Sequence, residues 1–74
     1  GLREQYVNKK IFNIGDLVEI KDQYKDGYAK DLTNSLGIIV EFCKDNTRAK
    51  VLYPSRENKI LLYLYLVKKV TENA

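Results

Sequence analysis

The side chains that most often carry out catalysis are nearly absent from this chain. Its 74 residues contain no histidine, and Cys43 is the only cysteine. Acid-base and nucleophilic catalysis usually need a histidine, or another base placed beside a serine or cysteine. Without such a base, the Cys43 thiol is expected to be structural rather than nucleophilic. The sequence therefore predicts that the protein is not an enzyme.

Carboxylates gather in the first half of the sequence, at Asp16, Asp22, Asp26 and Asp31. Carboxylate oxygens suit calcium, but this spacing lacks the central glycine and terminal glutamate of an EF-hand loop. We interpret the acids as part of a solvated loop, with Asp16 shaping the turn before the first strand. Zinc would need further cysteine or histidine ligands, and no glycine-rich phosphate loop is present. The sequence thus predicts no metal and no cofactor.

Tyrosine is the residue type in clear excess, with six in the chain. It offers a large, rigid contact surface with a polar tip and is enriched in protein interfaces. We predict that five of the six form a partner-binding surface: Tyr24, Tyr28, Tyr53, Tyr63 and Tyr65. The alternative is that about half of these rings fill the ends of the fold.

Basic residues near the tyrosines support a second hypothesis. Phosphate contacts from Lys21, Lys25, Lys30 and Arg48, with a tyrosine stacking on bases, would suit a nucleic acid. The net charge is only +3, however, and acids alternate with lysines along the sequence. Alternating signs are the ordinary design of a solvated surface. Segregation of charge in the folded protein therefore discriminates between the two hypotheses.

Composition describes one small folded domain. Hydrophobic residues make up 45% of the chain and charged residues 31%, which favours a globular domain over a disordered segment. The longest apolar run, residues 60–67, is far shorter than the roughly 20 residues of a membrane helix. No secretory signal is visible, and neither a disulfide framework nor a membrane partner is expected.

Short runs of β-branched and aromatic residues predict five strands separated by turns. Inward faces are expected for Val18 and Ile20 in the first strand, and for Ala49, Val51 and Tyr53 in the third. The strands are expected at residues 17–21, 37–42, 48–53, 60–63 and 66–70.

The second strand is the strongest, and we expect Ile38, Val40 and Phe42 to share one of its faces. Residues 22–35 are polar and turn-rich and are interpreted as one long loop. A hairpin turn is expected at residues 44–47 and a bend at residues 63–65. Strands this short and evenly spaced favour a partly open barrel over a sandwich.

Four segments then resemble the SH3-like small barrel: a Gly-Asp-x-Val-x-Ile opening at Gly15–Ile20, the strand that starts at Gly37, residues 51–53, and a closing Leu-x-x-Val-x-x-Val at residues 64–70. The resemblance covers residues 13–70. It implies an all-β, five-stranded, partly open SH3-like barrel at residues 14–71. An N-terminal arm or short helix at residues 1–13 would precede the barrel, and a tail at residues 72–74 would follow it.

The spacing is most similar to short barrel proteins of tailed bacteriophages, and less so to KOW-type modules and the small barrel protein of photosystem I. The phage resemblance implies a non-enzymatic structural or accessory component of an assembly such as a virion, with a protein partner and an oligomeric context. Its location would be the virion or host cytoplasm if phage-encoded, and otherwise the cytoplasm. A KOW-like nucleic-acid-binding module is the alternative. A signalling SH3 domain is disfavoured because the chain lacks tryptophan.

Overall fold

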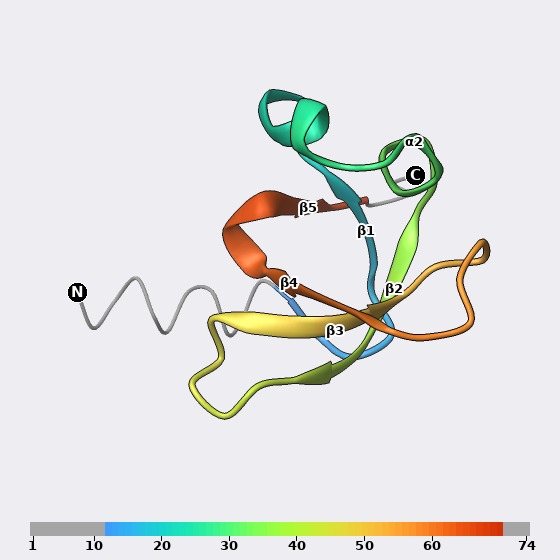
Figure 1. Cartoon of the computed structure of the whole chain (residues 1–74). Helices are drawn as coiled ribbons and strands as arrows, with labels where there is room; N and C mark the ends of the chain where they lie inside the picture. Colours follow the sequence, from blue (N-terminus) through green and yellow to red (C-terminus); the bar gives the residue numbers. More distant parts are fainter. Residues whose placement is uncertain (1–11, 71–74) are drawn as a thin grey trace.

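The computed structural model describes residues 12–70, which form one antiparallel sheet (Figure 1). The strand order is β4-β3-β2-β1-β5. Strands β1 to β4 thus lie side by side in chain order, and the last strand, β5, pairs with the other side of β1. The all-β, five-stranded prediction is confirmed. The strands are β1 Leu17–Ile20, β2 Gly37–Phe42, β3 Arg48–Leu52, β4 Ile60–Tyr63 and β5 Val67–Lys69.

The sheet curves into a barrel that remains partly open between its two edge strands, β4 and β5. These edges are joined by a single turn of 3-10 helix, η2 (Leu64–Leu66), where a bend was expected. Backbone bonds anchor this corner on both sides. The Leu64 N–H donates to the Thr47 carbonyl at 2.9 Å, and the Leu66 carbonyl accepts from the Lys21 N–H at 2.8 Å. The chain therefore changes direction at a fixed position between the edges.

The core lies inside this curved sheet and follows the alternation expected for β1 and β3. Val18 and Ile20 are fully buried, as are Ala49, Val51 and Tyr53. Along each segment, successive buried residues are separated by one outward-facing residue, which is the alternation of a half-buried strand. The predicted inward faces of both strands are confirmed.

The face predicted for β2 is wrong, because the strand contains a bulge. Ile38 pairs with Leu52 and Ile39 with Val51. The next residue of β2 that pairs with β3 is Glu41, so Val40 is an extra residue in β2. An extra residue reverses the inward and outward parity of everything beyond it. Before the bulge, Ile38 is exposed and Ile39 is fully buried; beyond the bulge, Phe42 packs against the core instead of facing the same side as Ile38. Ile38, Val40 and Phe42 do not share a face.

The segment predicted as one loop, residues 22–35, contains two short helices. The 3-10 helix η1 spans Asp22–Gly27, and α2 spans Lys30–Thr33. Both lie at one end of the barrel, at the top of Figure 1. Leu32 of α2 is buried and belongs to the core, so the segment closes that end of the barrel.

The turn before β1 is built as predicted. The Asp16 carboxylate accepts a hydrogen bond from the Asn13 N–H at 2.7 Å, and Gly15 adopts a φ of 97° that favours glycine. Phe12 was assigned to the N-terminal arm, but its side chain is buried in the core. The core therefore begins before residue 14. Residues 1–11 of the predicted arm and the predicted tail lie outside the described residues.

Candidate functional site

Three of the five predicted tyrosines form a continuous row of rings on the surface. The ring centroids of Tyr24 and Tyr65 lie 5.6 Å apart in an edge-to-face arrangement. Those of Tyr65 and Tyr63 also lie 5.6 Å apart, with the rings tilted by 35°. The Arg48 guanidinium carbon lies 5.6 Å from the Tyr63 ring centroid, which extends the row by a cation–π contact. We call these three rings the tyrosine row.

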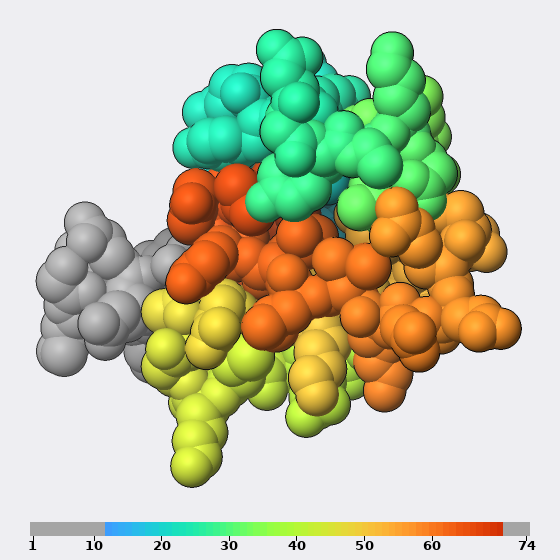
Figure 2. Space-filling model, viewed as in Figure 1, coloured from blue at the N-terminus to red at the C-terminus, as the bar shows by residue number. Residues whose placement is uncertain are grey.

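Three elements that are distant in sequence place these rings together. Tyr24 lies in η1, Tyr65 in η2, and Tyr63 at the end of β4 opposite Arg48 of β3. In Figure 2 the η1 segment (teal), the η2 and β5 segment (red-orange) and the start of β3 (yellow) follow one another down the visible face. Tyr65 is 58% exposed and Tyr63 46% exposed, so both rings are accessible to a partner.

The other two predicted tyrosines are outside the row. Tyr28 is half-buried and packs against the core. Tyr53 is only 1% exposed, so it is removed from any partner-binding surface and acts as a core residue. Its hydroxyl has no hydrogen-bond partner within residues 12–70, and burial raises the pKa of this phenol above 10.0. The alternative that some tyrosines fill the barrel applies to Tyr53.

The four predicted phosphate-binding residues come from three elements: Lys21 and Lys25 from the start and the body of η1, Lys30 from α2, and Arg48 from β3. Lys21 lines a small hollow beside Tyr65, together with Phe12 and Lys68. Arg48 stacks on Tyr63, Lys25 is bonded to Asp22 at 3.0 Å within η1, and Lys30 is exposed on α2. The bond to Lys25 also lowers the pKa of Asp22.

Acids and bases interleave over the described surface instead of segregating. Lys68 lies 3.5 Å from Glu19 across the β1–β5 pair, and Lys69 lies 3.5 Å from Asp16. Lys50 lies 3.7 Å from Glu41 across the β2–β3 pair. Each of these cations has a carboxylate at its side, so the field that would attract a phosphate backbone is reduced.

A second apolar surface, which was not predicted from the sequence, lies on the outside of the sheet. Leu17, Ile38 and Leu52 are direct cross-strand neighbours on β1, β2 and β3. All three are exposed, by 38%, 40% and 38%. We call them the aliphatic strip. The signal that would have found it is a pair of adjacent apolar residues in each strand, because strict alternation then places one of the pair outside.

A shallow groove of about 650 Å³ lies against the aliphatic strip. Its further lining comes from Leu36 and Pro54, with Ser35 and Arg56 at its polar edge. It therefore offers aliphatic contacts with few polar groups, which suits an apolar side chain and not a charged ligand.

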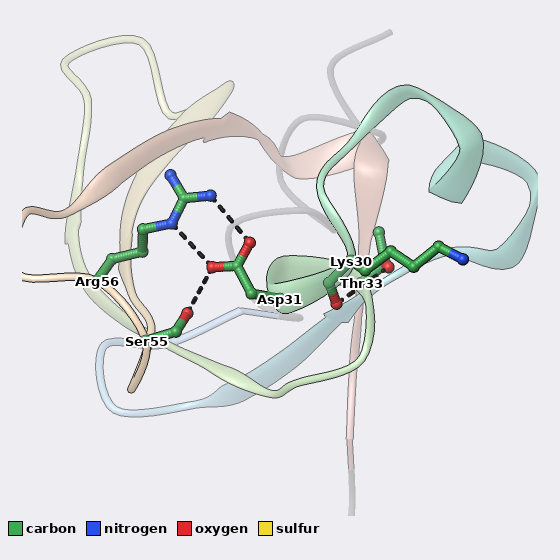
Figure 3. A network of polar contacts seen from close by, with 5 residues as sticks. All are labelled: Lys30, Asp31, Thr33, Ser55 and Arg56. Carbon is green, nitrogen blue, oxygen red and sulfur yellow. Dashed lines mark hydrogen bonds and ion pairs between the residues drawn. The ribbon is translucent and has the colours of Figure 1, made fainter.

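Asp31 of α2 is linked to Ser55 and to Arg56, a lining residue of the groove, by three side-chain hydrogen bonds (Figure 3). Its two carboxylate oxygens accept from the Arg56 guanidinium at 2.8 and 2.9 Å, and one also accepts from the Ser55 hydroxyl at 2.6 Å. The Arg56 guanidinium, followed by the Ser55 hydroxyl, holds the pKa of Asp31 far below its ordinary value. The predicted solvated acid is thus the centre of an ion-pair network between α2 and the β3–β4 connection.

No protein-family model, curated protein or solved structure matches the chain significantly. Within residues 12–70, no helix is long and apolar enough to cross a bilayer. In the same part of the chain, no three side chains of the histidine, cysteine, aspartate and glutamate types are grouped as metal ligands. The described surface therefore presents exposed aromatic side chains in the tyrosine row and exposed aliphatic side chains in the aliphatic strip.

Proposed function

We propose that this chain is a non-enzymatic protein-interaction module that forms a small structural or accessory part of a larger assembly. The tyrosine row carries the proposal. Tyrosine and arginine are among the residues most enriched at the energetic centres of protein interfaces. Here Tyr24, Tyr65, Tyr63 and Arg48 form one continuous series of contacts, in which Tyr65 and Tyr63 are exposed and Tyr24 and Arg48 are half-buried. Because the rings contact one another, their side chains are already restricted, and binding a partner would cost little additional side-chain entropy.

The fold supports an assembly role of this kind. The order of a Gly-Asp opening strand, a second strand that starts with glycine, a tight hairpin and a closing strand resembles short barrel proteins of tailed bacteriophages, so a virion component is the specific form of the proposal. The edge strands β4 and β5 add a second mode of contact, because an unpaired edge can accept a strand from a partner.

Substitution in the tyrosine row tests this proposal in the cells from which the protein comes. Tagged wild-type protein, Tyr65→Ala and Leu61→Ala would be recovered from those cells, and the co-purifying proteins quantified by mass spectrometry. Leu61 is the matched control because it is 47% exposed on the same strand as Tyr63 but outside the row. We expect a component that is retained in stoichiometric amount by wild type and Leu61→Ala and reduced at least about tenfold with Tyr65→Ala. Equal recovery with all three proteins would contradict the proposal.

A KOW-like nucleic-acid-binding role is the second candidate. Its support is the hollow beside Tyr65, where Lys21, Lys68 and Lys69 come from the end of β1 and from β5. The ion pairs of Lys68 with Glu19 and of Lys69 with Asp16 weaken it, because phosphate would have to compete with carboxylates already in place. The protein-interaction proposal therefore has the stronger support.

A further inference from the structure

Two cations beside the tyrosine row lack a carboxylate partner. Within residues 12–70, neither Lys21 nor Arg48 forms an ion pair, and both side chains are half-buried. The other unpaired cations of that part of the chain, Lys30, Lys44 and Lys59, are exposed. A half-buried cation is partly removed from water, so a carboxylate that reaches it is attracted more strongly than at an exposed lysine.

Backbone hydrogen bonds fix Lys21 between two elements that carry the row. Its N–H donates to the Leu66 carbonyl of η2 at 2.8 Å, and its own carbonyl accepts from the Tyr24 N–H of η1 at 2.9 Å. Lys21 and Tyr65 both line the hollow of about 330 Å³ at this corner. The hollow is therefore continuous with the tyrosine row, and Lys21 is the unpaired cation at that end.

Arg48 is the unpaired cation at the other end of the row. Its guanidinium carbon lies 5.6 Å from the Tyr63 ring centroid. The hydrogen bonds from Thr47, and to a smaller degree the Arg48 charge, lower the pKa of Asp45, but this carboxylate is bonded to Thr47 and not to Arg48. No described side chain accepts a hydrogen bond from the Arg48 guanidinium, so its donors are open to a partner.

The row is short enough for one peptide segment to cover it. From Arg48 through Tyr63 and Tyr65 to Tyr24 there are three successive steps of 5.6 Å. About five residues in extended conformation span this length. A single segment can therefore reach Arg48 with one side chain and Lys21 with another.

The remaining charges of the hollow favour a peptide over a nucleic acid. Lys68 is paired with Glu19 and Lys69 with Asp16. A nucleic-acid strand carries a negative charge on every nucleotide and would bring phosphates against these carboxylates. A peptide carries acidic side chains only at chosen positions, with apolar ones between them. That pattern matches two isolated cations separated by tyrosine rings.

We propose that the tyrosine row binds a short extended segment of a protein partner in which acidic side chains flank an aromatic or aliphatic residue. One carboxylate pairs with Lys21 at the hollow and another with Arg48, while the apolar residue packs on Tyr65 and Tyr63. The inference rests on the proposed function and adds the chemistry of the partner to it. The two cations then act in specificity, because a basic segment would be repelled at both ends of the row.

Selection from a random peptide library on the immobilised full chain tests this chemistry without assuming a partner. We expect wild-type protein to enrich peptides with acidic residues on both sides of an aromatic or aliphatic one. Enrichment of neutral or basic peptides would overturn the inference, and so would the absence of any enrichment.

Fluorescence anisotropy with the most enriched peptide assigns its binding to the two cations. Lys21→Gln and Arg48→Gln remove the charge and keep much of the side-chain length, and each should weaken the affinity at least about fivefold. Rising salt should weaken binding to wild type more than binding to the double variant. Lys50→Gln is the matched control, because Lys50 lies on the outward face of β3 with Arg48 but is paired with Glu41. It should bind as wild type does, and circular dichroism establishes that each variant is folded.

Unchanged affinity with both Lys21→Gln and Arg48→Gln would overturn the inference, as would an equal loss with Lys50→Gln. A labelled oligothymidylate that binds more tightly than the peptide, and is released by the same two substitutions, would assign the cations to a nucleic acid instead. The proposed function fails separately, when Tyr65→Ala recovers the same proteins from cells as wild type. A partner lost with Tyr65→Ala but retained with Lys21→Gln and Arg48→Gln would contradict only the acidic chemistry.

Discussion

Gly37 shows how a single position constrains the barrel. A Cβ built on this residue would overlap the Val51 Cγ1 and lie 2.9 Å from the Tyr53 Cζ. Both neighbours are among the most buried side chains of the core. The missing side chain of Gly37 is what allows the Tyr53 ring to pack directly against β2, as glycines in strands often do for a close approach.

The substitution Gly37→Ala should therefore destabilise the fold by overpacking. We expect the free energy of unfolding, measured by urea denaturation, to fall by about 1–3 kcal/mol. Gly27→Ala is the control, because no atom lies within 4 Å of a Cβ at that glycine. Its effect should be small. If both variants unfold at the same urea concentration, the close packing of Tyr53 against Gly37 is not rigid.

At the scale of elements, α2 depends on side chains from elsewhere in the chain. It is only four residues long, and a helix of this length is not stable by itself. Burial of Leu32 fixes its inner side, and the hydrogen bonds that Asp31 accepts from Ser55 and Arg56 fix its outer side. The β3–β4 connection and the end cap of the barrel are thereby held together (Figure 3). Arg56 of this connection also lines the groove.

This network predicts a pH dependence that can be assigned to one residue. The folded pKa of Asp31 lies below its ordinary value of 3.8, so its carboxylate contributes stability above that pH, and the contribution is lost as the pH falls toward the folded pKa. We expect Asp31→Asn to lower the melting temperature at neutral pH. The difference between wild type and variant should shrink as the pH falls below 3.8.

Asp22→Asn is a suitable comparison for this experiment. The pKa of Asp22 is also lowered, by Lys25, but that pair joins two residues of the same short helix. Its loss should change the melting temperature less, because a local exposed pair ties no distant segments together. A pH-independent difference between wild type and Asp31→Asn would contradict an ionic role for Asp31.

At the scale of the whole molecule, the arrangement of charge limits what the surface can bind. Lys25, Lys50, Lys68 and Arg56 each lie within 4 Å of a carboxylate from the described residues. Among residues 12–70, positive charges are therefore interleaved with negative ones. Proteins that bind nucleic acid through phosphate contacts concentrate such charges on one face.

Binding to labelled single-stranded and duplex nucleic acid across a salt series measures this property. We expect weak binding at low salt and little of the steep loss with rising salt that release of many counterions produces. Micromolar or tighter binding with a steep salt dependence would instead favour the KOW-like role. In that case Lys21→Ala should reduce both the affinity and the slope, because Lys21 lies in the hollow beside Tyr65.

The all-β class, the positions of the five strands and the inward faces of β1 and β3 could be predicted from the sequence. Local alternation is enough for this, because Val18 and Ile20, or Ala49 and Val51, must share a face wherever a regular strand forms. The three residues of the tyrosine row were also among the five predicted, because the resemblance to a small barrel implies that the segments carrying Tyr24, Tyr63 and Tyr65 adjoin one another. The same reasoning failed for Tyr53, because residue type alone does not distinguish an interface tyrosine from a buried one.

Only the tertiary structure decided which side of β2 faces outward. The run Ile38–Val40 is apolar at every position, so its sequence contains no alternation from which a face can be assigned. The bulge at Val40 is set by pairing with β3, and pairing between strands is a non-local property. That pairing turns Ile38 outward beside Leu17 and Leu52, and so creates the aliphatic strip. The local sequence thus determined which segments form strands, whereas the aliphatic strip depends on the register in which β1, β2 and β3 pair.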